Sequence, residues 1–253
     1  MNTFALVGKT LGHSFSRAWF TSKFVREGLS DYQYINLEVE TPELIPDQIR
    51  KMQVIGFNVT IPYKTAILPY LATLSAEAEA VGAVNTVLVQ DNQLHGFNTD
   101  VIGFESTLLP LLKPCHTEAL ILGTGGAAKA AAYVLKKLDI DYKMVSRNGD
   151  GDKVLNYRQL TMLHVRNAGI IINASPAGMF PDTGSRPDIP YEGVDKYHLL
   201  YDMVYNPPVT GFMEQGELYG ARVINGYEML VRQAEASWKI WTSPAQLVKK
   251  STL

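Results

Sequence analysis

Closely spaced polar side chains occur in the nine residues 56–64, Gly-Phe-Asn-Val-Thr-Ile-Pro-Tyr-Lys. The first four residues have the apolar character of a buried strand, and Pro62 cannot continue a central ladder, so the chain must turn there. Asn58, Thr60 and Lys64 are then expected at the mouth of a sheet, where ligands are commonly held. An ammonium group there can supply a proton or stabilise an oxyanion. Taken alone, the stretch favours the structural alternative, a strand, a proline turn and a solvated lysine that opens the next helix.

Other side chains able to contact a polar ligand are spread along the chain. Ser14 and Ser16 occupy alternate positions of a glycine-bordered loop, where two hydroxyls could hold a carboxylate or a polyhydroxylated ligand; turn and N-cap roles are the structural alternative. Asp100 precedes an expected helix, whose free backbone N–H groups stabilise a carboxylate. Gln233 is a polar residue among apolar ones in the last expected helix.

A glycine-rich turn predicts a second kind of site. The apolar strand 119–122 runs into Gly123-Thr124-Gly125-Gly126-Ala127-Ala128, and an alanine-rich helix is expected over 130–137. Such a turn lets backbone N–H groups approach a pyrophosphate at a helix N-terminus. The spacing differs from the usual fingerprint because alanine replaces or displaces the third glycine. With a strand before it and a helix and strand after it, the turn indicates dinucleotide binding rather than a simple tight turn.

The end of the following strand favours NADP over NAD. An NAD site usually has Asp or Glu there for the ribose hydroxyls, whereas this chain has Ser146, Arg147 and Asn148, and an arginine can pair with a 2′-phosphate. Asp150 and Asp152 follow closely, and a carboxylate turned into the site would repel that phosphate. Arg147 could also be a solvated loop charge.

Strands and helices alternate along the chain, which indicates parallel α/β layers. We expect strands over 3–7, 34–39, 83–89, 94–96, 119–122, 142–145, 169–174, 199–203 and 223–225, the last at a sheet edge, besides the one ending at 56–59. We expect helices over 17–27, 42–52, 66–71, 75–81, 101–111 and 130–137, and one after Gly226. Asn92 is expected in a hairpin turn.

Composition limits the class of protein. The 253 residues suffice for two domains, and a formal net charge of -2 gives no reason to expect nucleic acid or an anionic membrane as partner. The single cysteine excludes an internal disulfide and a cysteine-based zinc site. Without a signal pattern or a long apolar run, the sequence predicts a cytoplasmic globular protein.

The motifs together resemble the shikimate dehydrogenase family from the first strand to the last helix. The resemblance rests on the order of seven segments besides the glycine-rich turn, namely the serine loop 8–16, the motif 56–64, Gly-Ala-Val-Asn-Thr at 82–86, Gly-Phe-Asn-Thr-Asp at 96–100, Asn-Ala-Ser-Pro-Ala-Gly-Met at 173–179, Tyr-Asp-Met-Val-Tyr-Asn-Pro at 201–207 and Gly-Tyr-Glu-Met-Leu-Val-Arg-Gln at 226–233. It implies two α/β domains with a cleft between them. The substrate domain would comprise 1–101 and 227–253, and the Rossmann-like NADP domain 102–226.

The same resemblance assigns roles to individual residues. Lys64 and Asp100 would form the catalytic pair. The shikimate pocket would be lined by Ser14, Ser16, Asn58, Thr60, Asn85, Tyr205 and Gln233, with the serines and the tyrosine near the substrate carboxylate. The cofactor would contact Gly123, Gly125, Gly126, Ala127, Ser146, Arg147, Met203 and Gly226. The chain departs from the family pattern in two places. Thr10 and Arg17 stand where prolines are usual, so the serine loop would be less restricted, and Ser146 and Asn148 stand where asparagine and threonine are common beside the arginine.

The resemblance implies an NADP-dependent oxidoreductase that reversibly reduces 3-dehydroshikimate to shikimate in the aromatic pathway. The chemistry needs a hydride from the cofactor and a proton donor, and no metal. The alternatives are a related enzyme that accepts quinate or NAD, and a nonenzymatic protein that senses shikimate or cofactor. Sensing alone needs no proton donor, so Lys64 and Asp100 favour the enzyme. We expect a monomer or homodimer without nucleic-acid or membrane partners.

Overall fold

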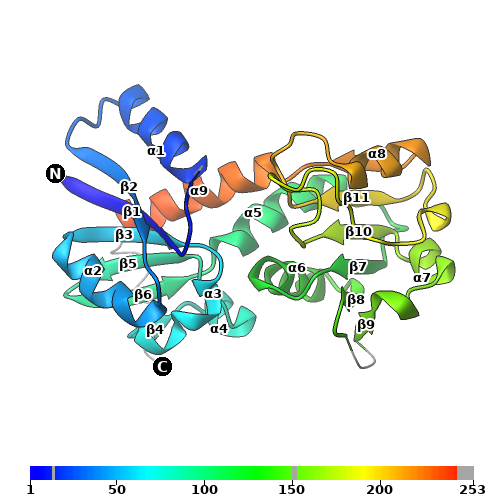
Figure 1. Ribbon diagram of the computed structural model, residues 1–253, viewed down its shortest axis with the longest axis horizontal. Helices are drawn as coiled ribbons and strands as arrows, with labels where there is room; N and C mark the ends of the chain where they lie inside the picture. The colour runs from blue at the N-terminus through cyan, green and yellow to red at the C-terminus, as the bar shows by residue number, and fades with distance from the viewer. Residues whose placement is uncertain (13–14, 150–152, 244–253) are drawn as a thin grey trace. The chain divides into compact units, whose positions relative to one another are not determined.

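The computed structural model describes residues 1–12, 15–149 and 153–243, which form two compact units. The first unit comprises Met1–Thr99 and the chain from Ala234, and the second comprises Asp100–Gln233. Each unit contains a six-stranded sheet flanked by helices (Figure 1). The domain bounds expected from the sequence fall near these positions, and the assignment of a function to each set of bounds stays a prediction.

The sheet of the first unit is mixed, with the strand order β2-β1-β3-β5-β6-β4. Its strands are β1 (Asn2–Gly8), β2 (Tyr32–Glu38), β3 (Val54–Val59), β4 (Thr73–Leu74), β5 (Thr86–Gln90) and β6 (Gln93–Phe97). The first three strands are parallel, as the alternation of strand and helix predicts, whereas β5 is antiparallel to both β3 and β6. Asp91 and Asn92 have positive φ and make the hairpin turn between β5 and β6.

Alternating side chains divide the core of the first unit between the two faces of this sheet. Ala5 and Val7 of β1 lie in one cluster with residues of α2 (Ile45–Lys51), α3 (Tyr63–Ala66) and α4 (Ala76–Val81). Phe4 and Leu6 of the same strand lie in the other cluster, against α1 (Phe15–Arg26) and the end of α9 (Tyr227–Thr242). A period of two along a strand places successive side chains on opposite faces, so both faces of β1 are buried.

The sheet of the second unit is entirely parallel. Its strands are β7 (Glu118–Leu122), β8 (Asp141–Ser146), β9 (Val154–Asn156), β10 (Ile170–Asn173), β11 (Leu199–Asp202) and β12 (Arg222–Ile224). They are ordered β12-β11-β10-β7-β8-β9. The order along the sheet reverses beside the first strand, β7, as it does in the doubly wound sheets that bind dinucleotides.

Helices cover both faces of the second sheet (Figure 1). The helices of this part of the chain are α5 (Thr99–Leu108), α6 (Gly126–Lys137), α7 (Met162–Asn167) and α8 (Gly211–Leu218). Val165 and Phe212 place α7 and α8 in one buried cluster with β7, β10 and β11. On another side of β11, the Tyr201 ring meets Phe104 of α5 at a centroid distance of 5.0 Å, and its hydroxyl lies 2.6 Å from Thr107.

Several expected elements differ in detail from the structure. The helix expected over 42–52 divides into a 3₁₀ turn, η1 (Pro42–Leu44), and α2, while η2 (Leu68–Tyr70) and η3 (Leu109–Leu111) replace expected helix. The remaining 3₁₀ turns are η4 (Tyr157–Gln159) and η5 (Tyr191–Gly193). The strand expected over 83–89 begins only at Thr86. The Ala83 carbonyl accepts from the Asn98 side chain and Val84 N–H donates to the Lys64 carbonyl, so these backbone groups leave the ladder. Within the described residues, every helix falls short of the length and apolarity that crossing a bilayer requires.

Candidate functional site

Asn58 lies at the carboxyl end of β3 on the face that is turned to α1 and α9. Its side chain is 4% exposed, and the amide oxygen accepts a hydrogen bond of 2.8 Å from the Tyr34 hydroxyl. The amide nitrogen donates to Ser237 Oγ at 2.9 Å and Thr86 Oγ1 at 3.1 Å. Asn58 is therefore fixed by side chains from β2, β5 and α9.

Backbone hydrogen bonds join the segments that carry Lys64 and Asn85 at one end of the first sheet. The carbonyl of Lys64 accepts the N–H of Val84 at 2.7 Å, and the Asn85 carbonyl accepts the N–H of Val59 at 2.9 Å. The Asn85 side-chain oxygen accepts the backbone N–H of Thr99 at 2.7 Å and so satisfies a free donor in the first turn of α5. Lys64 is half-buried in the short helix α3. Lys64, Asn58 and Asn85 thus lie on segments joined at one end of the first sheet, and the role of each in a site stays a prediction.

The loop after β1 is held by two side chains of β2. Leu11 N–H donates to the Glu38 carboxylate at 2.6 Å, and Leu11 C=O accepts from the Asn36 amide at 3.0 Å. Ser16 is buried in the first turn of α1, inside that helix rather than at its N-cap. Ser14, the other serine expected to bind a carboxylate, lies outside the described residues.

Thr60 packs against this loop as well as following β3. A Cβ at Gly8 would lie only 2.7 Å from the Thr60 methyl and 2.8 Å from Leu11, so the absence of a side chain at position 8 permits this approach. Thr60 N–H also donates to the Val7 carbonyl at 2.9 Å. The turn that carries Thr60 is therefore fixed directly against the end of β1.

Asp100 and Gln233 belong to the second unit, and both are buried. Asp100 occupies the first turn of α5, as expected from its position before an apolar helix. One turn later, a Cβ at Gly103 would lie 2.6 Å from the Met229 carbonyl and 3.2 Å from Gln233 Cβ. This close approach of α5 and α9 places the face that carries Asp100 beside Gln233, because residues three apart share a helix face.

The glycine-rich turn leaves space at the start of α6, the helix after β7. Gly123 has a φ of +127°, and a Cβ there would lie 2.8 Å from the Ala174 carbonyl, so this position requires glycine. A Cβ at Gly125, by contrast, would meet no heavy atom of the described residues within 4 Å. Gly126 begins the 12-residue α6, whose N-terminal N–H groups and positive dipole end suit a pyrophosphate. The turn thus fits a dinucleotide in both space and charge.

Ser146 and Arg147 lie at the carboxyl end of β8, next along the sheet from β7. Arg147 is exposed, and its carbonyl accepts a hydrogen bond from the Asn156 amide at 2.6 Å, which joins the end of β8 to β9. A Cβ at Gly149 would overlap the Leu155 carbonyl, so the turn after the arginine packs tightly on β9. An accessible guanidinium on a fixed backbone suits a phosphate at this edge.

Asp202 joins the segment that carries Met203 and Tyr205 to the end of β10 and the start of α8. One carboxylate oxygen accepts from the Asn173 amide at 3.0 Å and Val204 N–H at 2.9 Å, and the other accepts from the Thr210 hydroxyl at 2.5 Å. Burial raises the pKa of Asp202 to about 6 despite these three donors. Burial also raises the pKa of Tyr205, which keeps its hydroxyl protonated as a donor.

Gly226 lies against Met203 at the end of the second sheet. A Cβ at Gly226 would overlap the Met203 carbonyl, and Gly226 N–H donates to the Val204 carbonyl at 3.0 Å. These two residues, expected near a nicotinamide, therefore come together. Among the described residues there is no group of three or more His, Cys, Asp or Glu side chains that could hold a metal ion.

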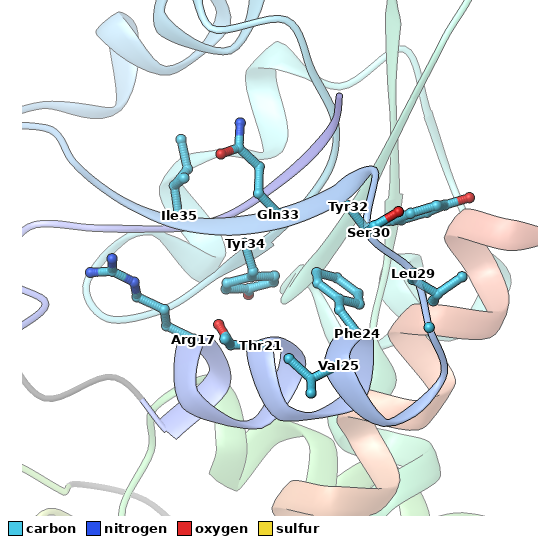
Figure 2. Close-up of a pocket in the computed structure, with 11 residues that line it drawn as sticks. Arg17, Thr21, Phe24, Val25, Leu29, Ser30, Tyr32, Gln33, Tyr34 and Ile35 are labelled. Atoms are coloured by element: carbon cyan, nitrogen blue, oxygen red, sulfur yellow. The ribbon is translucent and has the colours of Figure 1, made fainter.

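A groove of about 510 Å³ on the first unit runs between α1 and the edge strand β2 (Figure 2). Arg17 and Thr21 of α1 and Tyr34 of β2 line it, whereas Lys64 and Asn85 are not among its described lining residues. The groove is thus separate from the lysine motif, although Tyr34 also contacts Asn58.

Tyr34, Ser237 and Asp202 are residues around the site that the sequence analysis does not identify. Ser237 follows Gln233 by one helical turn in α9, a spacing that could have indicated a shared face.

The second unit has a doubly wound sheet with an open glycine turn, and the first unit carries Lys64, Asn58 and Asn85 on segments joined at one end of its sheet. This combination is that of a dinucleotide-dependent dehydrogenase. Residues 6–87 match the profile of the shikimate dehydrogenase substrate binding domain. The chain is 35% identical over 254 residues to shikimate dehydrogenase (NADP(+)) of Methanococcus maripaludis strain C7, covering 94% of this chain and 90% of the relative. This chain belongs to the shikimate dehydrogenase family.

Two further comparisons agree with that membership. The chain is 36% identical over 252 residues to shikimate dehydrogenase (NADP(+)) of Staphylococcus aureus strain bovine RF122, covering 95% of this chain and 92% of the relative. The crystal structure of shikimate 5-dehydrogenase from Thermus thermophilus in complex with NADP(H) and shikimate is 29% identical, with a TM-score of 0.84 and 98% of each chain covered. The predicted fold class, two α/β domains of which one is Rossmann-like, is confirmed.

Proposed function

We propose that this protein catalyses the reversible, NADP-dependent reduction of 3-dehydroshikimate to shikimate, a step toward chorismate and the aromatic amino acids. The observation that carries the proposal is family membership over nearly the whole chain, at 35% identity to an enzyme named for this activity. The structure supports it by fixing Lys64 and Asn85 at one end of the first sheet and an open glycine turn at the start of α6.

Lys64 acts as the proton donor in the direction of ketone reduction. NADPH, when bound, supplies the hydride to the carbonyl carbon, which places negative charge on the carbonyl oxygen. The Lys64 ammonium stabilises that oxygen and transfers a proton to it, which gives the alcohol. In the reverse direction the same amine takes up the hydroxyl proton.

Asp100 is the second member of the catalytic pair. A carboxylate next to an ammonium by itself raises the pKa of the ammonium and so opposes proton donation. The benefit of Asp100 therefore lies in orienting a substrate hydroxyl or in relaying the proton. Its fixed place in the first turn of α5 suits that orienting role.

The substrate carboxylate is held by hydroxyl groups, and the ring hydroxyls by amides. Ser16 and Ser14 are assigned to the carboxylate, Ser14 from its sequence position alone because it lies outside the described residues, and Tyr205 supplies a further protonated hydroxyl. The ring hydroxyls are assigned to the side chains Asn58, Thr60, Asn85 and Gln233. Hydrogen-bonding groups of this kind discriminate strongly against a substrate that lacks a matching hydroxyl.

The cofactor is held by the second unit. Gly123, Gly125, Gly126 and Ala127 receive the pyrophosphate at the N-terminus of α6, where a Cβ at Gly125 would meet none of the described residues within 4 Å. Ser146 and Arg147 receive the adenosine 2′-phosphate. Met203 and Gly226 lie at the nicotinamide end. The substrate bounds 1–101 with 227–253, the cofactor bounds 102–226, a monomer or homodimer and a cytoplasmic location all stay predictions.

The test is a matrix of initial rates for the purified protein with shikimate or quinate against NADP or NAD, followed by the absorbance of the reduced nicotinamide. The proposal predicts the highest kcat/KM for shikimate with NADP. Higher kcat/KM for quinate or for NAD would retain the reaction type and replace the substrate or cofactor. Ligand binding without turnover in any combination would contradict the proposal and support a sensor.

A further inference from the structure

Tyr34 is a buried residue to which the proposed function assigns no contact with the substrate. Its side chain extends from β2 toward α1 beside Phe24, while Gln33 and Ile35 point to the other side of the strand (Figure 2). The ring stacks on Phe20 at a centroid distance of 4.5 Å and an interplanar angle of 7°. At 4% exposure, Tyr34 has little contact with solvent. A hydroxyl carried on a ring packed in this way is held in one place.

The hydroxyl of Tyr34 joins two residues that are proposed to bind the substrate. It donates to the Asn58 amide oxygen at 2.8 Å, and the Ser16 hydroxyl makes a hydrogen bond with it from the start of α1. Burial raises the pKa of Tyr34 well above its usual value, while the Ser16 hydrogen bond opposes that rise. The phenol therefore stays protonated, and it can donate to Asn58 while accepting from Ser16.

The Asn58 side-chain amide is held from its other end by Ser237 of α9. An amide carries two N–H donors, and here three acceptors surround the nitrogen: Ser237 Oγ at 2.9 Å, Thr86 Oγ1 at 3.1 Å and the Asn85 carbonyl at 3.2 Å. Asn58 is thus oriented by protein groups on both its oxygen and its nitrogen. A small rotation of this side chain would break bonds at both ends.

Ser237 extends the same set of hydrogen bonds to Asn85. It is fully buried, and its Oγ lies 2.8 Å from Thr86 Oγ1 and 3.2 Å from Thr99 Oγ1. Thr99 in turn donates its backbone N–H to the Asn85 amide oxygen. That bond settles which end of the Asn85 amide is oxygen, so its NH₂ group is directed away from the Thr99 N–H.

We propose that Tyr34 and Ser237 are positioning residues for the substrate site. Tyr34 orients Ser16 and Asn58. Ser237 connects Asn58 to Thr86 and Thr99, whose hydroxyls each donate to the Asn85 amide oxygen at 3.2 Å. The hydrogen bonds run continuously from the residue assigned to the substrate carboxylate to one assigned to a ring hydroxyl. The network therefore sets the spacing between the two ends of the bound polyol acid. This inference rests on the proposed function, since it concerns how the same site recognises its substrate.

The test compares steady-state constants of the full-length wild-type protein, Tyr34→Phe, Ser237→Ala and the double variant. Tyr34→Phe removes one oxygen and keeps the stacked ring. Loss of one buried hydrogen bond predicts a KM for shikimate raised about five- to thirtyfold, with the KM for NADP within about twofold of wild-type. Both single variants act through Asn58, so the double variant is expected to show less than the product of the two single effects.

Tyr191→Phe is the matched control. Tyr191 is also buried, and its hydroxyl donates to the Pro187 carbonyl at 2.9 Å within the second unit. This variant loses a comparable hydrogen bond, so both its KM values are expected to match the wild-type values. Thermal melting of each variant measures any loss of stability separately from the kinetic constants.

The outcomes separate this inference from the proposed function. No turnover of shikimate by the wild-type protein contradicts the function itself, and the inference falls with it. Wild-type turnover with an unchanged shikimate KM in Tyr34→Phe overturns the inference alone. The inference is also overturned if the apparent kcat of Tyr34→Phe decreases in proportion to its folded fraction while both KM values stay constant. That result would mean that Tyr34 has a purely structural role.

Discussion

Asp202→Asn removes a titrating group whose pKa the fold has raised, and it should change how stability depends on pH. The carboxyl is fully buried, and burial raises its pKa from 3.8 to about 6. The folded protein therefore retains this proton at pH values where the unfolded chain has released it. As pH rises from about 4 to 6, ionisation favours the unfolded chain, so this group lowers the free energy of unfolding across that window.

The magnitude follows from the two pKa values. One pKa unit corresponds to ~1.4 kcal/mol, so the full effect of moving from 3.8 to about 6 is about 3 kcal/mol. Between pH 4.5 and pH 7.5, the linkage relation predicts that this group lowers the free energy of unfolding by about 2 kcal/mol. Asparagine keeps an oxygen that can accept from Asn173 and Val204, and its NH₂ group can donate to the Thr210 oxygen.

The assay is thermal or urea unfolding of the wild-type protein and Asp202→Asn over this pH range. We expect the wild-type protein to lose stability relative to the variant as pH rises, by about 2 kcal/mol or roughly 4–8 °C in Tm for a chain of this size. Asp195→Asn is the control, since this carboxyl is exposed. Burial raises the pKa of Asp195, but the hydrogen bonds from Tyr197 and His198 lower it, and the net shift is downward. A difference between wild-type and Asp202→Asn that stays constant from pH 4.5 to pH 7.5 would refute the reasoning.

Three other substitutions test separate parts of the structure. Lys23→Met removes a buried ammonium that pairs with Glu27 at 2.8 Å and Glu235 at 3.1 Å, and should lower the free energy of unfolding by about 1–2 kcal/mol in urea titrations. Gly125→Ala should leave Tm unchanged, because the added methyl meets no atom of the part of the chain that the structure describes, yet raise the KM for NADP about tenfold or more by occupying the pyrophosphate space. Arg147→Ala should raise the KM for NADP about tenfold or more and leave the KM for shikimate unchanged.

Each of these three has a matched control in the chain. Arg50→Met breaks an exposed pair with Asp47 and should change stability by less than about 0.5 kcal/mol. Gly211→Ala adds a methyl at the start of α8 with only ordinary contact to Arg186, and Arg166→Ala removes an exposed arginine of α7. Equal effects in a test variant and its control would contradict the assigned role, as would an unchanged KM for NADP in Gly125→Ala.

Local sequence patterns predict much of the fold, because the physics that forms these elements is local. Apolar runs locate the strands β1, β3, β7 and β10, and the glycine turn before an alanine-rich segment predicts the start of a helix after β7. The short helices α7 and α8 are not among the expected elements. Their signal was present in Thr161 and Thr210, whose side chains accept N–H groups at the two helix starts.

The polar network around Asn58 could not be predicted in the same way. Tyr34 is 24 residues from Asn58 in sequence, and Ser237 is 179 residues from it. A tyrosine in an edge strand and a serine in an amphipathic helix are common, and only the packing of α1 and α9 on one face of the sheet brings them to Asn58. Asp202 likewise occupies the end of an apolar strand, and one of its three donors, the Asn173 amide, lies 29 residues away in sequence.

The central claim is that Lys64 supplies the proton for reduction of a ketone held on the first unit. The most direct measurement is kcat for shikimate with saturating NADP in the wild-type protein, Lys64→Ala and the control Lys51→Ala, which removes an exposed lysine at the end of α2. Loss of a positioned proton donor predicts a kcat lowered about 10²–10⁴-fold in Lys64→Ala, with the KM for NADP and the activity of Lys51→Ala unchanged. A Lys64→Ala protein whose kcat stays within a few-fold of wild-type would contradict the account.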